Sequence, residues 1–267
     1  MTLISFLGPK GTFTHQAANI LGDELIPYCT IPAVMESVFN EESSMGVVPI
    51  ENSIEGPVGI TLDSLAHNFD LKIFKEIIIP INQNLIVNPE TKLEDIKDVY
   101  SHSQAISQCS EFISKNNLQP HYSVSTARAA KDIIGDKTKA AIGNANVVDL
   151  YDLEILKSNI QDTDNNKTRF VVLSKKQHKP TGRDKTSIIF SIYEDRPGSL
   201  YKILGIFEKD NVNLTKIESR PSKEALGKYL FFVDFYGHVD DELTQNILSE
   251  IKNNTYFFKI LGSYPEF

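Results

Sequence analysis

The sequence has only two cysteines, no long run of apolar residues and no excess of basic residues. Cys29 and Cys109 lack the spacing of a metal site, and two cysteines do not make a disulfide scaffold. No apolar stretch is long enough to span a membrane, and residues 1–6 have neither the basic region nor the cleavage pattern of a signal peptide. We therefore expect a cytoplasmic protein that needs no membrane.

Charge of either sign is spread along the chain, with a net charge of −8. Residues 185–267 hold 10 basic and 12 acidic residues, and the first 184 residues hold 17 and 23. Neither part has the basic surface of a nucleic-acid binder, so we expect no nucleic-acid partner. The overall field opposes an anionic ligand, which would need local Arg, Lys or helix N-termini.

The amino-acid composition is that of an ordinary globular protein. The length of 267 residues suits two domains. Short apolar strands alternate with helical patterns up to residue 173, which predicts an α/β domain with mostly parallel sheets. Residues 77–83 and 153–160 are expected to cross between two lobes. Lys175 to Arg183 breaks all periodicity and indicates a linker.

The region after the linker has a cleaner pattern. Strands are predicted over 186–193, 213–220, 228–237 and 256–260, and helices from about 199 to 207 and over 240–252. The order βαββαβ is that of a ferredoxin-like domain.

Polar side chains gather where predicted strands end, which is where ligands bind in open α/β sheets. Thr168 and Arg169 stand at the mouth of an apolar run that ends at Leu173. Asn52 and Ser53 follow another strand, and a ligand-binding role is favoured there over a turn in which they only satisfy backbone groups.

The sequence also predicts the N-terminal caps of two helices near the candidate site residues. Thr12 or Thr14 is expected to cap a helix after a Gly-rich turn, which favours an anion, although a plain turn fits equally well. Ser103 is expected to cap a helix that continues past Cys109, with His102 in the loop before it. Cys109 falls on the apolar stripe of that helix, which indicates a core residue rather than a nucleophile.

Five segments together resemble the prephenate dehydratase family, and the tail resembles its ACT regulatory domain. The catalytic segments are Gly8–Phe13, Val48–Ser53, Tyr100–Ser103 with Gln108-Cys109, Ser125–Ala127 and Thr168–Leu173. The regulatory segments are Pro197–Leu200 and Glu218–Pro221. The resemblance covers essentially the whole chain and contains no chorismate mutase or prephenate dehydrogenase segment, so it implies the monofunctional form.

The resemblance implies an α/β, two-lobed, periplasmic-binding-protein-like catalytic domain over residues 1–176. Lobe one would comprise about 1–78 and 160–176, and lobe two about 79–159. A linker over 177–185 would lead to the ACT domain at 186–267. The expected reaction converts prephenate to phenylpyruvate in phenylalanine biosynthesis, with no cofactor and no metal.

The resemblance also assigns roles to residues. Thr168 would be catalytic, as a hydrogen-bond donor to the departing oxygen. Substrate contacts would come from Asn52, Ser53, Ser101, Gln108, Thr126, Arg169 and Phe170. Glu51 and His102 would support these residues without contacting the substrate. Arg169 either clamps a carboxylate through its fork geometry or forms a structural ion pair.

Feedback inhibition by L-phenylalanine at a dimer interface is implied for the tail, in a homodimer or a dimer of dimers. The effector would contact Gly198, Ser199, Leu200, Asn213 and Leu214. The family often has Gly-Ala-Leu-Val where this chain has Gly198-Ser199-Leu200-Tyr201, a difference that bears on effector affinity and choice. The main alternative is a two-lobed small-molecule binding or sensor protein without catalysis. A pure ACT interaction module does not fit, because most of the chain lies outside the tail.

Overall fold

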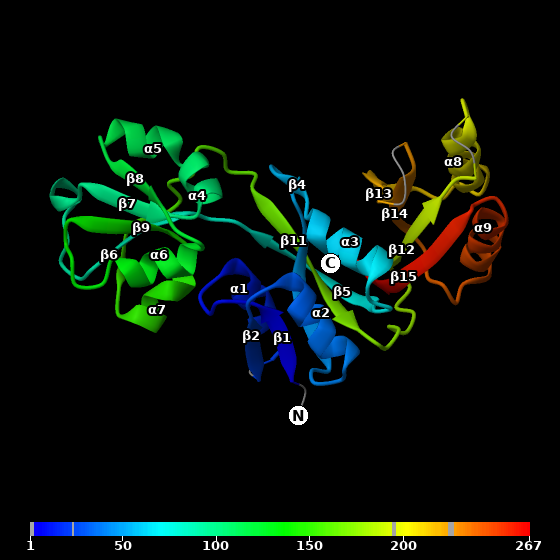
Figure 1. Cartoon of the computed structure of the whole chain (residues 1–267), viewed down its shortest axis with the longest axis horizontal. Helices are drawn as coiled ribbons and strands as arrows, with labels where there is room; N and C mark the ends of the chain where they lie inside the picture. Colours follow the sequence, from blue (N-terminus) through cyan, green and yellow to red (C-terminus); the bar gives the residue numbers. More distant parts are fainter. Residues whose placement is uncertain (1–2, 23, 194–195, 224–226) are drawn as a thin grey trace. The chain divides into compact units, whose positions relative to one another are not determined.

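The computed structural model describes residues 3–22, 24–193, 196–223 and 227–267 (Figure 1). By its contacts the chain divides into two compact units. Unit 1 comprises residues 1–34, 47–56 and 78–170, and unit 2 comprises residues 35–46, 57–77 and 171–267. None of the helices in the described ranges has the length and apolar character needed to cross a bilayer.

The described strands form three sheets, two of them in the region predicted to be α/β. The first sheet has the order β2-β1-β3-β11-β5, with β4 paired to β3. Its strands are β1 (Ile4–Leu7), β2 (Leu25–Tyr28), β3 (Met45–Asn52), β4 (Gly56–Pro57), β5 (Lys72–Pro80) and β11 (Lys167–Ser174). The helices between them are α1 (Phe13–Asn19), α2 (Ile31–Phe39) and α3 (Gly59–His67).

The second sheet lies entirely in unit 1 and has the order β10-β6-β9-β7-β8. Its strands are β6 (Asn84–Val87), β7 (Asp98–Ser101), β8 (Gln119–Tyr122), β9 (Lys139–Gly143) and β10 (Glu154–Lys157). A 3-10 turn, η1 (Leu93–Asp95), precedes β7, and the helices are α4 (Ser103–Ser107), α5 (Ser110–Lys115), α6 (Thr126–Asp132), η2 (Ala145–Val147) and α7 (Val148–Tyr151).

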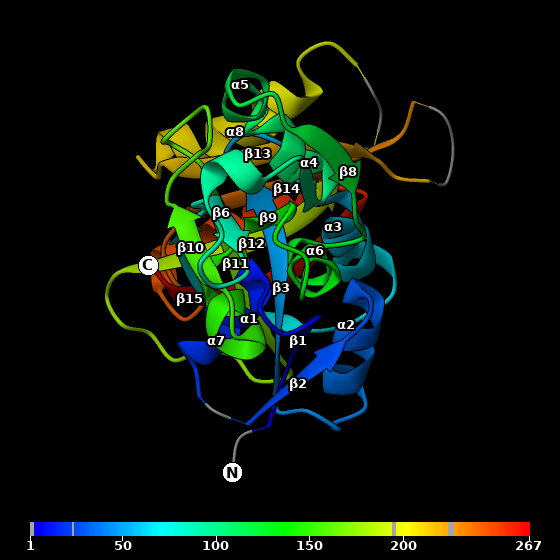
Figure 2. The same cartoon turned by 90° about the vertical axis from the view of Figure 1, so that its left-hand side faces the viewer.

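Alternating side chains of the second sheet face two separate cores. Leu85 and Ile142 pack with Ile106 and Cys109 of the α4–α5 side, whereas Ile86 and its neighbours pack against α6. Accordingly, α4 and α5 cover one face of this sheet and α6 and α7 the other (Figures 1 and 2). The period-2 alternation of a strand is what gives one sheet two buried faces.

Two details of the prediction for this region were wrong. Residues 153–160 were expected as the return crossing, but Glu154–Lys157 form β10, which pairs antiparallel with β6 at the sheet edge. Because β6 is also antiparallel to β9, this sheet is mixed rather than mostly parallel. The apolar pattern of a short edge strand and that of an extended crossing are alike, so periodicity does not separate them.

The tail has the predicted βαββαβ order. Its elements are β12 (Asp184–Ser191), α8 (Ser199–Lys209), β13 (Leu214–Pro221), β14 (Tyr229–Tyr236), α9 (Glu242–Asn253) and β15 (Phe257–Pro265). The sheet order β13-β14-β12-β15 is ferredoxin-like. Phe190 of β12 and Phe235 of β14 pack with Phe207 of α8 and Ile251 of α9, so both helices cover the same face (Figure 1).

Within unit 2, the opposite face of this sheet lies against α3 and β5. Lys185 pairs with the fully buried Glu76 at 2.9 Å. The Lys259 ammonium donates to the carbonyls of Leu65 and Phe69 at 2.8 and 2.9 Å. A Cβ on Gly262 would stand 2.4 Å from the carbonyl oxygen of Ile73, so the two backbones are in direct contact.

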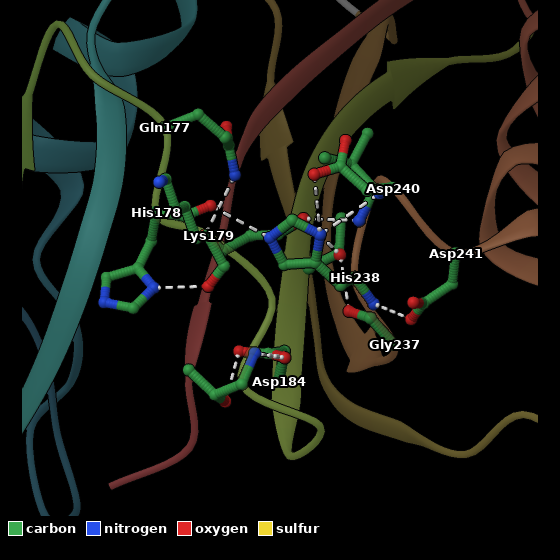
Figure 3. Close-up of polar contacts among 12 residues, drawn as sticks. Gln177, His178, Lys179, Asp184, Gly237, His238, Asp240 and Asp241 are labelled. Carbon is green, nitrogen blue, oxygen red and sulfur yellow. Dashed lines mark hydrogen bonds and ion pairs between the residues drawn. The ribbon is translucent and has the colours of Figure 1, made fainter.

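The segment predicted as a linker is held by ordered hydrogen bonds (Figure 3). The ring of His238, 1% exposed, bonds through Nε2 to the carbonyl oxygen of His178 at 3.0 Å. Gln177 Nε2 donates to the Ser263 carbonyl at 2.9 Å. Burial acts to raise the pKa of Asp184, but hydrogen bonds from Thr181 and Gly182 outweigh it and lower the pKa of this carboxyl.

Candidate active site

A cavity of about 370 Å³ in unit 1 collects most of the residues predicted to bind substrate. Its volume is in the range of small-molecule sites. The polar side chains lining it are Thr12, Thr14, Cys29, Asn52, Gln83, His102, Gln104, Gln108, Ser125, Thr126 and Thr168, and the other lining residues are Leu7, Gly8, Phe13, Pro49, Ile81, Ala105, Val124 and Phe170.

Thr168 and Asn52 meet at this cavity although they are far apart in the sequence. Asn52 ends β3, Thr168 lies in β11, and Asn52 Nδ2 donates to Thr168 Oγ1 over 2.9 Å. The orientation of the Asn52 amide is fixed, because its Oδ1 accepts from the backbone N–H groups of Ile54 and Glu55 at 2.9 and 3.0 Å. Since the Thr168 oxygen receives a hydrogen bond from Asn52, its own hydrogen is available to another acceptor.

A row of amides continues from this pair. Asn52 Nδ2 also donates to Asn166 Oδ1 at 2.7 Å, and Asn166 Nδ2 donates to Gln108 Oε1 at 2.9 Å. Asn166 is 1% exposed. Asn52 and the buried Asn166 together therefore connect the hydroxyl of Thr168 to Gln108, which caps the C-terminal end of α4 and also lines the cavity.

Strand alternation in β11 separates the residues that were predicted as neighbours in the site. Thr168 and Phe170 line the cavity, whereas Arg169 does not. Arg169 is 8% exposed, and its Nη1 lies 3.9 Å from the carboxylate of Glu51. Of the two predicted roles of Arg169, this position favours the ion pair, because side chains one residue apart point to opposite faces of a sheet.

The two serines predicted as substrate contacts do not line the cavity. Ser53 Oγ donates to the carbonyl of Asn165 and accepts from the N–H of Lys167, both at 2.9 Å. Ser101 is fully buried, and its hydroxyl donates to the carbonyl of Ile142 at 2.6 Å. Both hydroxyls thus satisfy the backbone, a role that the turn pattern around Ser53 also predicts.

The helix after β7 differs from the prediction. His102, not Ser103, caps α4: its Nδ1 accepts from the N–H of Gln104 at 3.4 Å. The helix then ends, and α5 starts after Cys109, whose φ of −121° is not helical. His102 was expected in the loop behind the contacts, but it lines the cavity.

The wall of the cavity is rich in neutral hydrogen-bond donors. Among the described residues, no Lys or Arg side chain lines it. The first turns of α1, α4 and α6 contribute lining residues, and helix starts favour negative charge. Thr12 caps α1 as predicted, with its hydroxyl oxygen accepting from the N–H of His15.

Two titratable groups near the site have pKa values displaced by burial. Burial, with Asp162 nearby, raises the pKa of Cys109 to about 12, so its thiol is neutral and belongs to the core, as predicted. Burial and the charge of Lys10 lower the pKa of His15, whose ring stacks on Phe6. No group of three or more metal-ligating side chains is found among residues 3–22, 24–193, 196–223 and 227–267.

Sequence reasoning missed three glutamine and asparagine residues of the site. Gln83 and Gln104 line the cavity. Asn166 accepts a hydrogen bond from Asn52 and donates one to Gln108. The available signal for Asn166 was its place in the polar loop before β11. Gln83 follows an apolar strand, the same kind of position that marked Asn52 as a candidate.

The residues predicted to bind the effector lie at two ends of the ferredoxin-like domain: Gly198, Ser199 and Leu200 stand where α8 begins, whereas Asn213 and Leu214 follow that helix and stand where β13 begins. Gly198 precedes α8 with a φ of 87°, and Leu200 and Leu214 pack partly into the domain core. Asn213 is exposed and β13, the strand after it, is an edge strand. A separate cavity of about 290 Å³ in unit 2 contains none of the five predicted residues.

Comparison with known proteins identifies one family over most of the chain. The family model described as prephenate dehydratase matches residues 4–178, and that of the ACT domain matches residues 186–253. A prephenate dehydratase of Methanocaldococcus jannaschii is 43% identical, with 97% of this chain and 96% of the relative covered. The prephenate dehydratase of Bacillus subtilis is 36% identical, with 99% of each covered.

A solved structure extends the similarity to the fold. The prephenate dehydratase of Arthrobacter aurescens, in complex with L-Phe, is 34% identical and superposes with a TM-score of 0.90 over 99% of this chain and 90% of its own. Sequence and fold together define an α/β catalytic region followed by an ACT domain. The chain belongs to the prephenate dehydratase family, which confirms the resemblance found in the sequence.

Proposed function

We propose that this chain converts prephenate to phenylpyruvate, carbon dioxide and water. The observation that carries the proposal is the Thr168 hydroxyl, which lines the cavity and receives a hydrogen bond from Asn52. Prephenate has to lose its ring hydroxyl, and carbon–oxygen cleavage needs a donor at the departing oxygen. Thr168 has its hydrogen free for that oxygen.

The reaction balances without a cofactor. The electron pair of the bond to the ring carboxylate moves into the ring, carbon dioxide leaves, and the carbon–oxygen bond breaks as the ring becomes aromatic. The departing hydroxide takes up one proton to become water, so the prephenate dianion and one proton give the phenylpyruvate monoanion, carbon dioxide and water. We assign Thr168 the hydrogen bond to the departing oxygen, with the proton drawn from water.

The rest of the cavity suits the two carboxylates differently. Thr126 and the first turns of α1, α4 and α6 offer donors to the carboxylate that is retained. Ile81, Ala105 and Phe170 give part of the wall an apolar surface. A less polar surrounding favours loss of the ring carboxylate as carbon dioxide.

The test is a spectroscopic assay for phenylpyruvate with the purified full chain and prephenate, together with a measurement of released carbon dioxide. We expect the two products in equal amounts. A folded chain that binds prephenate, as seen by calorimetry, but forms neither product would instead be the binding or sensor protein considered above.

We further propose that the tail is a regulatory domain that binds L-phenylalanine through Gly198, Ser199, Leu200, Asn213 and Leu214. Support comes from the L-Phe complex of the Arthrobacter aurescens relative and from the open edge of β13, which another copy of the chain could pair with. The proposed organisation is a catalytic domain at 1–176, a linker at 177–185 and the regulatory domain at 186–267, in a cytoplasmic homodimer or dimer of dimers.

A further inference from the structure

Two buried side-chain atoms of the cavity residues have no hydrogen-bond partner among the described residues. They are Gln83 Oε1 and Gln108 Nε2. Gln83 is only 3% exposed, so its amide has little access to bulk water. An unpaired buried polar atom is destabilising, and most such atoms in proteins find a partner. The pair therefore points to a ligand that completes it.

The direction of each amide in this row follows from the backbone. Asn52 Oδ1 is held as an acceptor by two N–H groups, so Asn52 donates to Asn166, and Asn166 donates to Gln108 Oε1. Gln83 Nε2 lies 3.4 Å from that same Gln108 oxygen and must be its second donor. The orientation of each amide thus determines the orientation of the next. Gln83 Oε1 is left as an acceptor and Gln108 Nε2 as a donor.

The backbone of Gln83 is also fixed. Its N–H donates to Gln161 Oε1 at 2.9 Å, and its carbonyl accepts from the N–H of Ile160 at 2.8 Å. The side-chain oxygen of Gln83 and the second hydrogen of its Nε2 are therefore left for a ligand, and the oxygen is the only acceptor of the two.

We propose that Gln83 is a specificity-determining residue that accepts the hydrogen of the substrate's ring hydroxyl, an inference that depends on the proposed function. At neutral pH, prephenate has two carboxylates and a keto group, which only accept hydrogen bonds, and one hydroxyl, which can donate. Gln83 Oε1 can therefore pair with the ring hydroxyl alone. With its hydrogen on Gln83, the hydroxyl oxygen turns its lone pairs toward the donors of Thr168 and Gln108.

The test compares Gln83→Met, which keeps the length of the side chain but removes the acceptor, with the unchanged chain. The expected result is a fall in kcat/KM for prephenate on the order of 10-fold or more, because a site built for a hydroxyl discriminates strongly by it. Phenylpyruvate has no ring hydroxyl, so its inhibition constant is expected to stay within about twofold. A purely structural role of Gln83 would weaken the binding of both molecules.

Gln161→Met is the matched control, since Gln161 supports the same backbone from outside the cavity lining. We expect it to change thermal stability but not the ratio between prephenate turnover and phenylpyruvate inhibition. Unchanged kcat/KM in Gln83→Met, or an equal loss for phenylpyruvate, would overturn the inference. Absence of any product from the unchanged chain would instead contradict the proposed function.

Discussion

Asn52 Nδ2 lies 2.9 Å from Thr168 Oγ1, across 116 residues of sequence, and donates a hydrogen bond to it. The contact joins the end of β3 to the start of β11, and it directs the hydrogen of the Thr168 hydroxyl away from Asn52. A hydroxyl that accepts from an amide inside the wall is left to donate toward the cavity. The proposed reaction depends on the Thr168 O–H being directed toward the cavity.

Replacement of Asn52 by Asp should reverse that direction. The new carboxylate can still accept from the N–H groups of Ile54 and Glu55, but it would also accept the Thr168 hydrogen and withdraw it from the cavity. We expect kcat to fall on the order of 100-fold, as when one positioned donor is removed from an active site. Asn40→Asp, the same charge change at an exposed residue, should leave kcat within about twofold.

The carboxylate of Asp63 should stabilise unit 2 in a pH-dependent manner. It receives hydrogen bonds from Arg220 at 3.0 and 3.2 Å and lies 2.7 Å from the Lys223 ammonium. Asp63→Asn should lower the free energy of unfolding by about 1–3 kcal/mol at pH 7, as for a partly buried ion pair that loses one partner.

The pH dependence follows from the direction of the pKa shift. Burial acts to raise the pKa of Asp63, but the hydrogen bonds and charges of Arg220 and Lys223 lower it below its ordinary value of 3.8. The stabilisation is therefore complete well above pH 3.8 and is lost as the pH falls through the lower pKa of the folded state. Urea unfolding of the unchanged chain and of Asp63→Asn should show a difference in free energy of unfolding that narrows as the pH falls from about 5 to about 3. A difference in free energy of unfolding that grows toward low pH would contradict this role of Asp63.

Gly262 should tolerate no side chain. Its φ is +146°, and an added Cβ would stand 2.4 Å from the carbonyl oxygen of Ile73. Gly262→Ala should lower the free energy of unfolding by about 3 kcal/mol or more, because a backbone contact has to open. Gly205→Ala provides the contrast, since that glycine lies inside α8 with nothing within 4 Å and should become more stable by about 0.5–1 kcal/mol. Thermal unfolding of the two variants measures the difference.

L-phenylalanine should stabilise the chain and inhibit it. A ligand that binds only the folded state raises Tm by mass action, and allosteric coupling is typically about 1–3 kcal/mol. We expect both effects at millimolar L-phenylalanine, and a higher concentration for half inhibition in Asn213→Ala. A chain that shows no thermal shift with L-phenylalanine would not use the tail as proposed.

Much of the fold was predictable, because each domain repeats a simple alternation of elements. The βαββαβ order of residues 184–265 follows from apolar periodicity, and the glycine before α8 marks the start of that helix. The edge strand β10 was not predicted, since its residues also fit an extended crossing. Pairing partners are set by tertiary contacts that a local pattern does not contain.

The site was predictable at the level of strand ends but not of side-chain direction. Asn52 and Thr168 were selected from polar residues at two strand ends, and the structure brings them together. Arg169, at the same strand end as Thr168, and Ser101, selected from the family resemblance, were also predicted as substrate contacts. Arg169 instead faces Glu51, and Ser101 bonds the backbone. Which face of β11 meets the cavity depends on the register of the strand, and the register is set by its neighbours.

The turnover of Thr168→Val tests the central claim most directly. Valine keeps the shape of the side chain and removes only the hydroxyl that Asn52 orients. Thr91→Val is the matched control, because Thr91 is also buried and its hydroxyl has no partner among the described residues. We predict that kcat for phenylpyruvate formation falls at least about 100-fold in Thr168→Val and stays near normal in Thr91→Val. Near-normal turnover in a folded Thr168→Val chain would show that the departing hydroxyl is handled by another group.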